Sequence, residues 1–479
     1  MRTNFRILRF FLATLLLAGC SKNHEIDTTT EIDPIIYLDD NGITIRCDDS
    51  GRVGDTFEFA GITYTIVDEA LLRTMVDNGE DVTTVCTSRV TDMSLLFARS
   101  SFNQDIGAWD VSNVTNMYRM FEDTPFNRDI GAWDVQNVTN MSRMFENSPF
   151  NQDISPWDMQ QVTNMSWMFH NSPFNQPIGD WGVTNVVDMS GMFASSLFNQ
   201  DISSWDVSNV TAMAGLFTDS AFNRDISAWD VSNVTRMTRM FAYSAFNKDI
   251  GDWDVSKVTN MEGMFSNSLF DQDISAWDVG SVTDMTFMFT GSVFNQDISA
   301  WDVGNVVYMR YMFDASQFNQ DISTWKVSNV SIMGVMFRDS QFNRDISSWD
   351  VSNVINMSGM FEGSPFNQDI SAWDVSSVAD MYGMFEDSPF NQDISAWDVG
   401  NARNMSNMFS GSPFNQDISA WNVINVIGME AMFRDSQFNH DLSGWNVDNV
   451  FACREFSTDT PQWTLPKPNF TSCDPNESL

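Results

Sequence analysis

The sequence predicts an α/β solenoid, a stack of short coils that each lie on their neighbours. The main observation is a strict period of 24 residues. Trp109 recurs at that spacing fifteen times in fifteen, ending at Trp445, and Phe102 recurs equally well to Phe438. A fixed period without insertions is typical of stacked coils, because one such unit cannot bury its own apolar face. We therefore expect the tryptophans to lie inside the stack.

The N-terminus predicts export. Residues 1–19 combine arginines with a short apolar run, as in a secretory signal peptide. The segment ends in Leu-Ala-Gly-Cys, which resembles the lipobox of bacterial lipoproteins, so Cys20 is the expected site of lipid attachment. The alternative is an ordinary signal peptide with a chance cysteine. Residues 20–35 are polar, and we expect them to form a flexible tether.

The rest of the chain divides into a repeat array between two caps. We assign residues 36–82 to an N-terminal cap, 83–456 to the solenoid and 457–479 to a C-terminal cap, because open coil ends would expose core and strand edges. Within one repeat, Asp105–Val111 predicts a strand, and the spacing of apolar residues in Val114–Phe121 predicts a short helical or 3₁₀ segment. Parallel strands about 4.8 Å apart would give a rod or shallow arc on the order of 70 Å long.

Two polar positions recur almost as strictly as the core. Asn103 recurs fourteen times in fifteen, which indicates a ladder of side-chain amides that satisfies backbone groups, with a row of ligand sites as the alternative. Asp105 also recurs fourteen times in fifteen. Its column, which includes Asp129 and Asp153, predicts turn capping. Calcium bound between these carboxylates is the alternative.

Four cysteines remain once Cys20 is assigned to the lipid. Cys47 and Cys86 lie in or beside the N-terminal cap, and Cys453 and Cys473 lie at the far end of the array. Because the whole stack separates the two ends, we expect the disulfides Cys47–Cys86 and Cys453–Cys473, with free buried thiols as the alternative.

Composition and motifs exclude several functions. The formal net charge of -39 argues against nucleic acid as a partner. The three histidines are not near a nucleophile–base arrangement, and the chain contains no phosphate loop or dinucleotide motif. We therefore expect no enzymatic activity, no cofactor and no dedicated metal site.

Positions that vary between repeats are candidates for binding, with ordinary solvent-facing variation as the alternative. Exposed aromatic residues and arginines are favoured at interfaces. The candidates are Tyr118, Arg119, Trp167, Arg236, Arg239, Phe287, Arg310 and Tyr311.

The pairing of Trp-Asp-Val with Met-x-x-Met-Phe at fixed spacing, as in 366–379 and 356–361, resembles the BspA-like leucine-rich-repeat surface proteins of bacteria. The resemblance covers residues 83–456. It implies a leucine-rich-repeat-like solenoid on the cell surface that binds an extracellular protein or glycan, and it implies no catalytic residues. We expect a lipid-anchored adhesin or ligand-binding scaffold in the bacterial cell envelope. A structural envelope spacer and a calcium-ordered surface rod are the alternatives.

Overall fold

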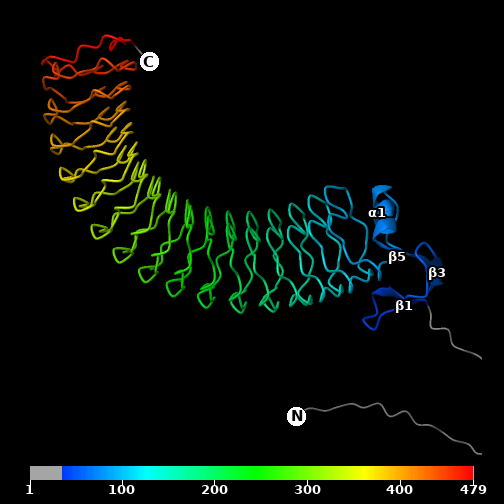
Figure 1. The fold of residues 1–479 in the computed structure, drawn as a ribbon. Helices are drawn as coiled ribbons and strands as arrows, with labels where there is room; N and C mark the ends of the chain where they lie inside the picture. The colour runs from blue at the N-terminus through cyan, green and yellow to red at the C-terminus, as the bar shows by residue number, and fades with distance from the viewer. Residues whose placement is uncertain (1–34, 478–479) are drawn as a thin grey trace, which may run out of the picture.

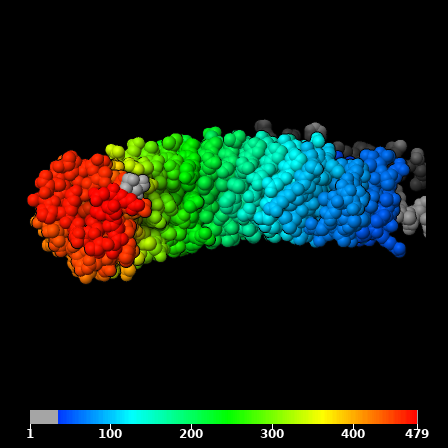
Figure 2. Space-filling model, turned by 90° about the horizontal axis from the view of Figure 1, so that it is seen from above, coloured from blue at the N-terminus to red at the C-terminus, as the bar shows by residue number. Residues whose placement is uncertain are grey.

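A computed structural model describes residues 35–477. The predicted signal segment, Cys20 and most of the tether fall outside the described residues. The array forms one continuous stack of coils that bends into an arc (Figure 1), and a view at right angles shows a narrow, unbranched body (Figure 2). Isolated parallel bridges link every consecutive pair of coils from Asp92 to Ala452.

The N-terminal region consists of two small sheets and one helix. Strand β1 (Ile36–Leu38) pairs antiparallel with β2 (Ile45–Cys47). Strand β3 (Thr56–Phe59) pairs antiparallel with β4 (Ile62–Ile66), which pairs in parallel with β5 (Val85–Cys86). Helix α1 (Glu69–Asp77) follows β4. It is the only helix in the described part of the chain, and its nine residues are too few to cross a bilayer.

Polar contacts cap helix α1 and attach it to the first coil. At its N-terminus, Asp68 caps the helix by accepting a hydrogen bond from the Leu71 N–H at 2.9 Å. On the other side, the Arg73 guanidinium donates to the Ser94 carbonyl at 2.9 Å, which attaches the helix to the start of the array. The structure contains both predicted disulfides. Their Cα atoms are 6.2 Å apart for Cys47–Cys86 and 5.9 Å apart for Cys453–Cys473.

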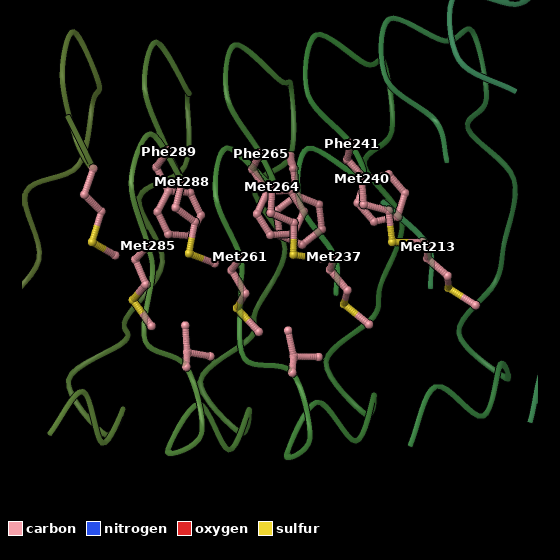
Figure 3. Close-up of a cluster of buried hydrophobic side chains, with 14 of the residues drawn as sticks. Met213, Met237, Met240, Phe241, Met261, Met264, Phe265, Met285, Met288 and Phe289 are labelled. Atoms are coloured by element: carbon pink, nitrogen blue, oxygen red, sulfur yellow. The ribbon is translucent and has the colours of Figure 1, made fainter. Parts of the chain in front are cut away.

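The stack has a continuous apolar core of tryptophan, phenylalanine, methionine, isoleucine and valine. Methionine and phenylalanine side chains from successive coils line up inside it (Figure 3). The prediction that the tryptophans are internal is confirmed: all fifteen from Trp109 to Trp445 are at most 5% exposed. Each indole also uses its N–H inside the stack, as Trp277 Nε1 does by donating to the Ile250 carbonyl at 3.0 Å.

The predicted strand and helical segment of each repeat are wrong. The segment 105–111 makes no strand, because its N–H groups bond within the coil. Asp105 Oδ1 accepts from the Gly107 N–H, and the Trp109 N–H donates to the Ile106 carbonyl. The segment 116–123 is instead a run of overlapping turns in which alternate N–H groups bond to the next coil. A helix would have used all of them internally.

The coil that contains Arg239 illustrates the pattern. Its Met237, Arg239 and Phe241 N–H groups donate to carbonyls of the following coil at 2.8 to 3.2 Å. In alternation with them, the Met240 and Ala242 N–H groups donate to carbonyls three residues earlier in the same coil at 3.1 and 3.2 Å. Side chains in such turns repeat every three or four residues, which is why the apolar pattern imitates a helix.

The asparagine ladder is confirmed. Asn247 Oδ1 accepts the Asp271 N–H of the next coil at 3.0 Å, and the same contact recurs along the array. The Asp105 column caps turns as predicted: Asp129 accepts the Gly131 N–H, and Asp153 accepts the Ser155 N–H, both at 2.9 Å.

The bend has a local cause that the sequence left open. Direct backbone bonds hold neighbouring 116–123 segments about 4.8 Å apart. Ring centroids lie 5.7 Å apart between Phe265 and Phe289, and 6.4 Å apart between Trp277 and Trp301. Coils spaced more closely on one side are wedge-shaped. The stack therefore bends towards the hydrogen-bonded segments, which lie on the inner side of the arc.

Residues after the array close its far end. Trp463 packs edge-on against Phe433 and Phe438, with ring centroids 5.3 and 4.8 Å apart. The Leu442 N–H donates to the Pro466 carbonyl at 3.0 Å, so the last coil is covered by residues that do not continue the repeat.

Replacing Trp277 by Ala should lower the free energy of unfolding by about 3–5 kcal/mol, since it empties a large core volume and leaves the Ile250 carbonyl without its indole donor. Each coil contacts only its neighbours, so amide exchange should accelerate most in the flanking coils. Thermal unfolding and hydrogen exchange measure both effects, with exposed Ser281→Ala as control. Uniform acceleration over the whole array would contradict the stacked-coil account.

Candidate functional site

The candidate binding surface lies on the hydrogen-bonded segments. We call the residues at 119 and every 24 positions onward to 455 the 119 column, and we name the 116, 118 and 123 columns in the same way. Each of the fifteen residues in the 119 column has a positive φ, between 49° and 65°, and so has each residue of the 123 column from 123 to 459. This left-handed conformation costs about 1–2 kcal/mol for most residues and favours glycine, asparagine and aspartate.

The 123 column follows that preference and serves as an internal comparison. Twelve of its fifteen residues are Asn, Asp or Gly, the exceptions being Ser195, Tyr243 and Ala315. A solenoid position selected for backbone conformation alone should look like this column.

The 119 column does not follow the preference. Only six of its fifteen residues are Gly or Asn. The other nine are Arg119, Arg143, Trp167, Arg239, Phe287, Tyr311, Val335, Ala431 and Glu455. Val335 and Ala431 are buried. The other seven are large side chains at the surface, in a conformation where glycine would be more stable, which indicates that these side chains serve another purpose.

The structure brings most of the sequence candidates into this column. Arg119, Trp167, Arg239, Phe287 and Tyr311 belong to it. The remaining candidates lie beside it, Tyr118 and Arg310 in the 118 column and Arg236 in the 116 column. Sequence reasoning missed Arg143, whose register, one period from residues already chosen, would have identified it. Val335 has the same register but is buried, so it is not a surface candidate.

Trp167 is held in a defined orientation. The guanidinium of Arg143 lies 5.3 Å from its ring centroid, and His170 meets the ring edge-on at 4.9 Å. Arg143 also donates to both oxygens of Glu146, at 3.1 and 2.8 Å, and His170 Nδ1 lies 3.1 Å from the same carboxylate. Burial tends to raise the pKa of Glu146, but hydrogen bonds from His170 and Arg143 outweigh it and leave the pKa lowered.

Gly191 makes room for this indole. A Cβ atom at Gly191 would lie 2.5 to 2.7 Å from three ring atoms of Trp167. Any larger residue there would displace the ring. The glycine therefore satisfies the positive φ and also lets Trp167 lie over the next coil.

Phe287 and Tyr311 form a second aromatic group. Their rings stack with centroids 4.7 Å apart. The Arg310 and Arg338 guanidinium groups lie 4.8 and 5.6 Å from the Tyr311 ring centroid. Arg338 is fixed by two hydrogen bonds to Asp314, at 2.9 and 3.0 Å.

Two adjoining grooves lie between these groups and share Arg239. The first, about 330 Å³, lies between Trp167 and Arg239, and its other lining residues are His170, Ala194, Ser195, Ala214, Gly215, Thr218 and Thr238. The second, about 240 Å³, lies between Arg239 and Phe287. Gly215 and Gly263, which have no side chains, leave this space open.

Farther along the same face lies a group of carboxylates. Glu386 is half-buried, and burial together with the charges of Glu362 and Asp387 raises its pKa to about 7. The pKa of Glu362 is also raised, mainly by burial. These side chains lie against Gly359 and Gly383 of the 119 column, with carboxylate oxygens 2.9 and 3.1 Å from where a Cβ would stand.

The structure offers no support for calcium between Asp105, Asp129 and Asp153. Each carboxylate accepts an N–H of its own turn. Residues 35–477 contain no group of three or more His, Cys, Asp or Glu side chains arranged to hold a metal ion.

The continuous stack of 24-residue coils, with a variable column along its inner side, defines a repeat protein of the solenoid class. Five overlapping stretches, residues 68–173, 170–268, 242–341, 338–413 and 364–463, match the family described as "Mycoplasma protein of unknown function, DUF285". The chain belongs to this family. No curated protein matches the sequence.

One solved structure that is similar is an internalin, InlF, from Listeria monocytogenes strain 4b F2365. The sequences are 10% identical, the TM-score is 0.32, and the match covers 58% of this chain and 84% of the internalin chain.

Glu386→Gln should stabilise the protein at pH 8 and leave it nearly unchanged below pH 4. The folded-state pKa of Glu386 lies above its ordinary value of 4.5, so folding disfavours the ionised form, and stability falls as the pH rises from about 4.5 to above 7. The gain should be on the order of 1 kcal/mol, since solvent screens a half-exposed group. Thermal melts at the two pH values measure it.

Asp393→Asn is the comparison of opposite sign. Hydrogen bonds from Ser395 lower the pKa of Asp393, so this change should weaken the protein slightly at pH 8 and not below pH 3. A Glu386→Gln protein whose gain did not depend on pH would contradict the assignment of a raised pKa.

Proposed function

We propose that this chain is a non-catalytic, lipid-anchored protein of the bacterial cell envelope whose solenoid displays a ligand-binding face. The observation that carries the proposal is the 119 column, where arginine and aromatic side chains stand at positive φ although glycine fills the same position in five other coils. The ligand expected is an extracellular protein or glycan. Nucleic acid remains an unfavourable partner because of the net charge of -39.

The form of the surface supports a binding role. Trp167, Phe287 and Tyr311 are only partly buried, Arg239 is exposed, and each is fixed to a backbone that neighbouring coils hold rigid. Preordered aromatic and arginine side chains lose little conformational entropy on binding, which is why they carry much of the affinity at interfaces. A spacer without a ligand would gain nothing from bearing the cost of these residues.

The anchor is the second part of the proposal. It rests on the Leu-Ala-Gly-Cys sequence at 17–20 and on the apolar run before it. Two or three acyl chains would hold the chain on a bilayer durably, at about 0.8 kcal/mol per buried methylene. The solenoid would then be carried at a distance from the membrane by the polar segment that follows Cys20.

The anchor is tested by expressing the full chain in a bacterium supplied with an alkyne-tagged palmitate. The wild-type chain should incorporate the label and partition into the detergent phase. Cys20→Ala should lose both properties, while Cys47→Ala should keep the label. Labelling that survives Cys20→Ala would exclude attachment at this residue.

The binding face is tested with full-length protein, purified in detergent, on panels of matrix proteins and glycans. Trp167→Gly and Arg239→Gly should weaken binding at least tenfold. Arg239→Gly should leave the unfolding midpoint unchanged or higher, because relief of positive φ, about 1 kcal/mol, offsets the exposed pair with Glu262. Asp219→Gly in the 123 column is the control.

Two results would reject the proposed function. One is retention of every ligand by both variants. The other is the absence of any ligand for the wild-type chain, which would favour the spacer.

A further inference from the structure

The 118 column contains backbone donors that most coils satisfy in the same way. Where Asn or Asp stands in the 116 column, its side-chain oxygen accepts the N–H two residues later. Ser166 donates to Asn164 and Thr286 donates to Asp284, both at 2.9 Å. Ten coils make this contact. Since these acceptors lie at the surface of the stack, the N–H groups point to that surface.

Six coils lack the acceptor, in three consecutive pairs at positions 212 and 236, 308 and 332, and 428 and 452. In the first pair, Ala212 and Arg236 replace Asn or Asp, and the N–H groups of Ala214 and Thr238 make no hydrogen bond within residues 35–477. Both residues line the groove between Trp167 and Arg239, which no 118-column residue of the other two pairs does. At this groove the loss of the cap leaves two donors directed to its surface.

The spacing of these donors restricts the ligand. The Gly215 N–H donates to the Thr238 carbonyl at 2.8 Å, so the two coils are in strand-like register and their free N–H groups lie about 4.8 Å apart. Carbonyls on one side of an extended peptide recur at about 6.8 Å, twice the rise per residue, and would not match both donors. A carboxylate, with two acceptor oxygens, can bond to both.

The charges that line the groove agree with an anionic group. Arg239 has a side chain 59% exposed and uses only Nη2 in its 3.1 Å contact with Glu262. Asp219 of the 123 column accepts the hydroxyl of Ser195, a residue that lines the groove, at 3.2 Å. The groups not already engaged at the groove are therefore the two N–H donors and most of the guanidinium.

The remaining wall is the indole of Trp167, which lies over Gly191. A flat, partly apolar ring packs well against such a surface. We infer that the groove between Trp167 and Arg239 binds an acidic sugar, with its carboxylate on the Ala214 and Thr238 N–H groups and Arg239, and its ring against Trp167. This inference rests on the proposed function and specifies the ligand class of the same face.

The test restores the missing cap. Ala212→Asn supplies the acceptor that ten other coils already have, so it should occupy the Ala214 N–H without harming the fold. The probes are a tetrasaccharide containing glucuronic acid and its carboxyl-reduced counterpart, titrated calorimetrically into full-length protein. The wild-type chain should bind the acidic form at least tenfold more tightly, and Ala212→Asn should lose at least tenfold in affinity for it with an unchanged or raised unfolding midpoint.

Two matched variants control for position and charge. Tyr308→Asn restores the same acceptor three coils beyond the groove and should bind as the wild type does. Arg236→Ala removes a cation without supplying an acceptor and should lose less than threefold. Equal binding of the acidic and reduced tetrasaccharides, or full affinity in Ala212→Asn, would overturn the inference. If a different ligand then bound through Trp167 and Arg239, the proposed function would stand without it.

Discussion

The structure depends on how the segment 116–123 divides its N–H groups. Alternate groups bond within the coil and to the next coil, so each coil is both closed on itself and tied to its neighbour. This division requires left-handed residues at two positions per repeat. It also sets the close spacing on one side of the stack, from which the arc follows. The aromatic and methionine columns fill the space that this backbone leaves.

The same constraint explains why the proposed binding face can be recognised at all. A position with a fixed, unusual φ has a preferred set of residues, and departures from that set have a known cost. The 123 column respects the preference, whereas the 119 column departs from it in nine coils. A stack with an almost unbroken apolar core tolerates such losses, and proteins commonly bear strain at functional positions.

The sequence alone was sufficient to predict the features that depend on the 24-residue period. Repetition predicted the burial of Trp109 and its copies and the Asn103 ladder. Separation along the chain predicted one disulfide at each end of the stack. The internal form of the coil did not follow, because Met117, Met120 and Phe121 have a spacing common to helices and to overlapping turns. The distinction depends on the sign of φ at Arg119 and Asp123. Arginine gives no sign of a positive φ, and the Asn, Asp and Gly residues of the 123 column, which do favour it, are also common in ordinary surface turns.

The candidate site was predictable in part for the same reason. Variation and residue type identified Trp167, Arg239, Phe287 and Tyr311, but they did not separate the 119 column from its neighbours. The missing acceptors are visible in the sequence, since Asn or Asp gives way to other residues in three pairs of adjacent repeats, Ala212 and Arg236 being the first pair. These substitutions can be interpreted only when the structure shows that the N–H two residues later needs an acceptor.

An acidic chain can still hold an anionic sugar, because the range of charge interactions is short. At physiological ionic strength the Debye length is about 8 Å, less than two coil spacings, so most of the net charge of -39 is screened at the groove. Direct contacts with Arg239 and two backbone donors then determine the affinity, while the distant carboxylates mainly slow the approach of the ligand. Excess negative charge and recognition of a carboxylate are therefore compatible on one molecule, provided that the donors are held in place before the ligand arrives.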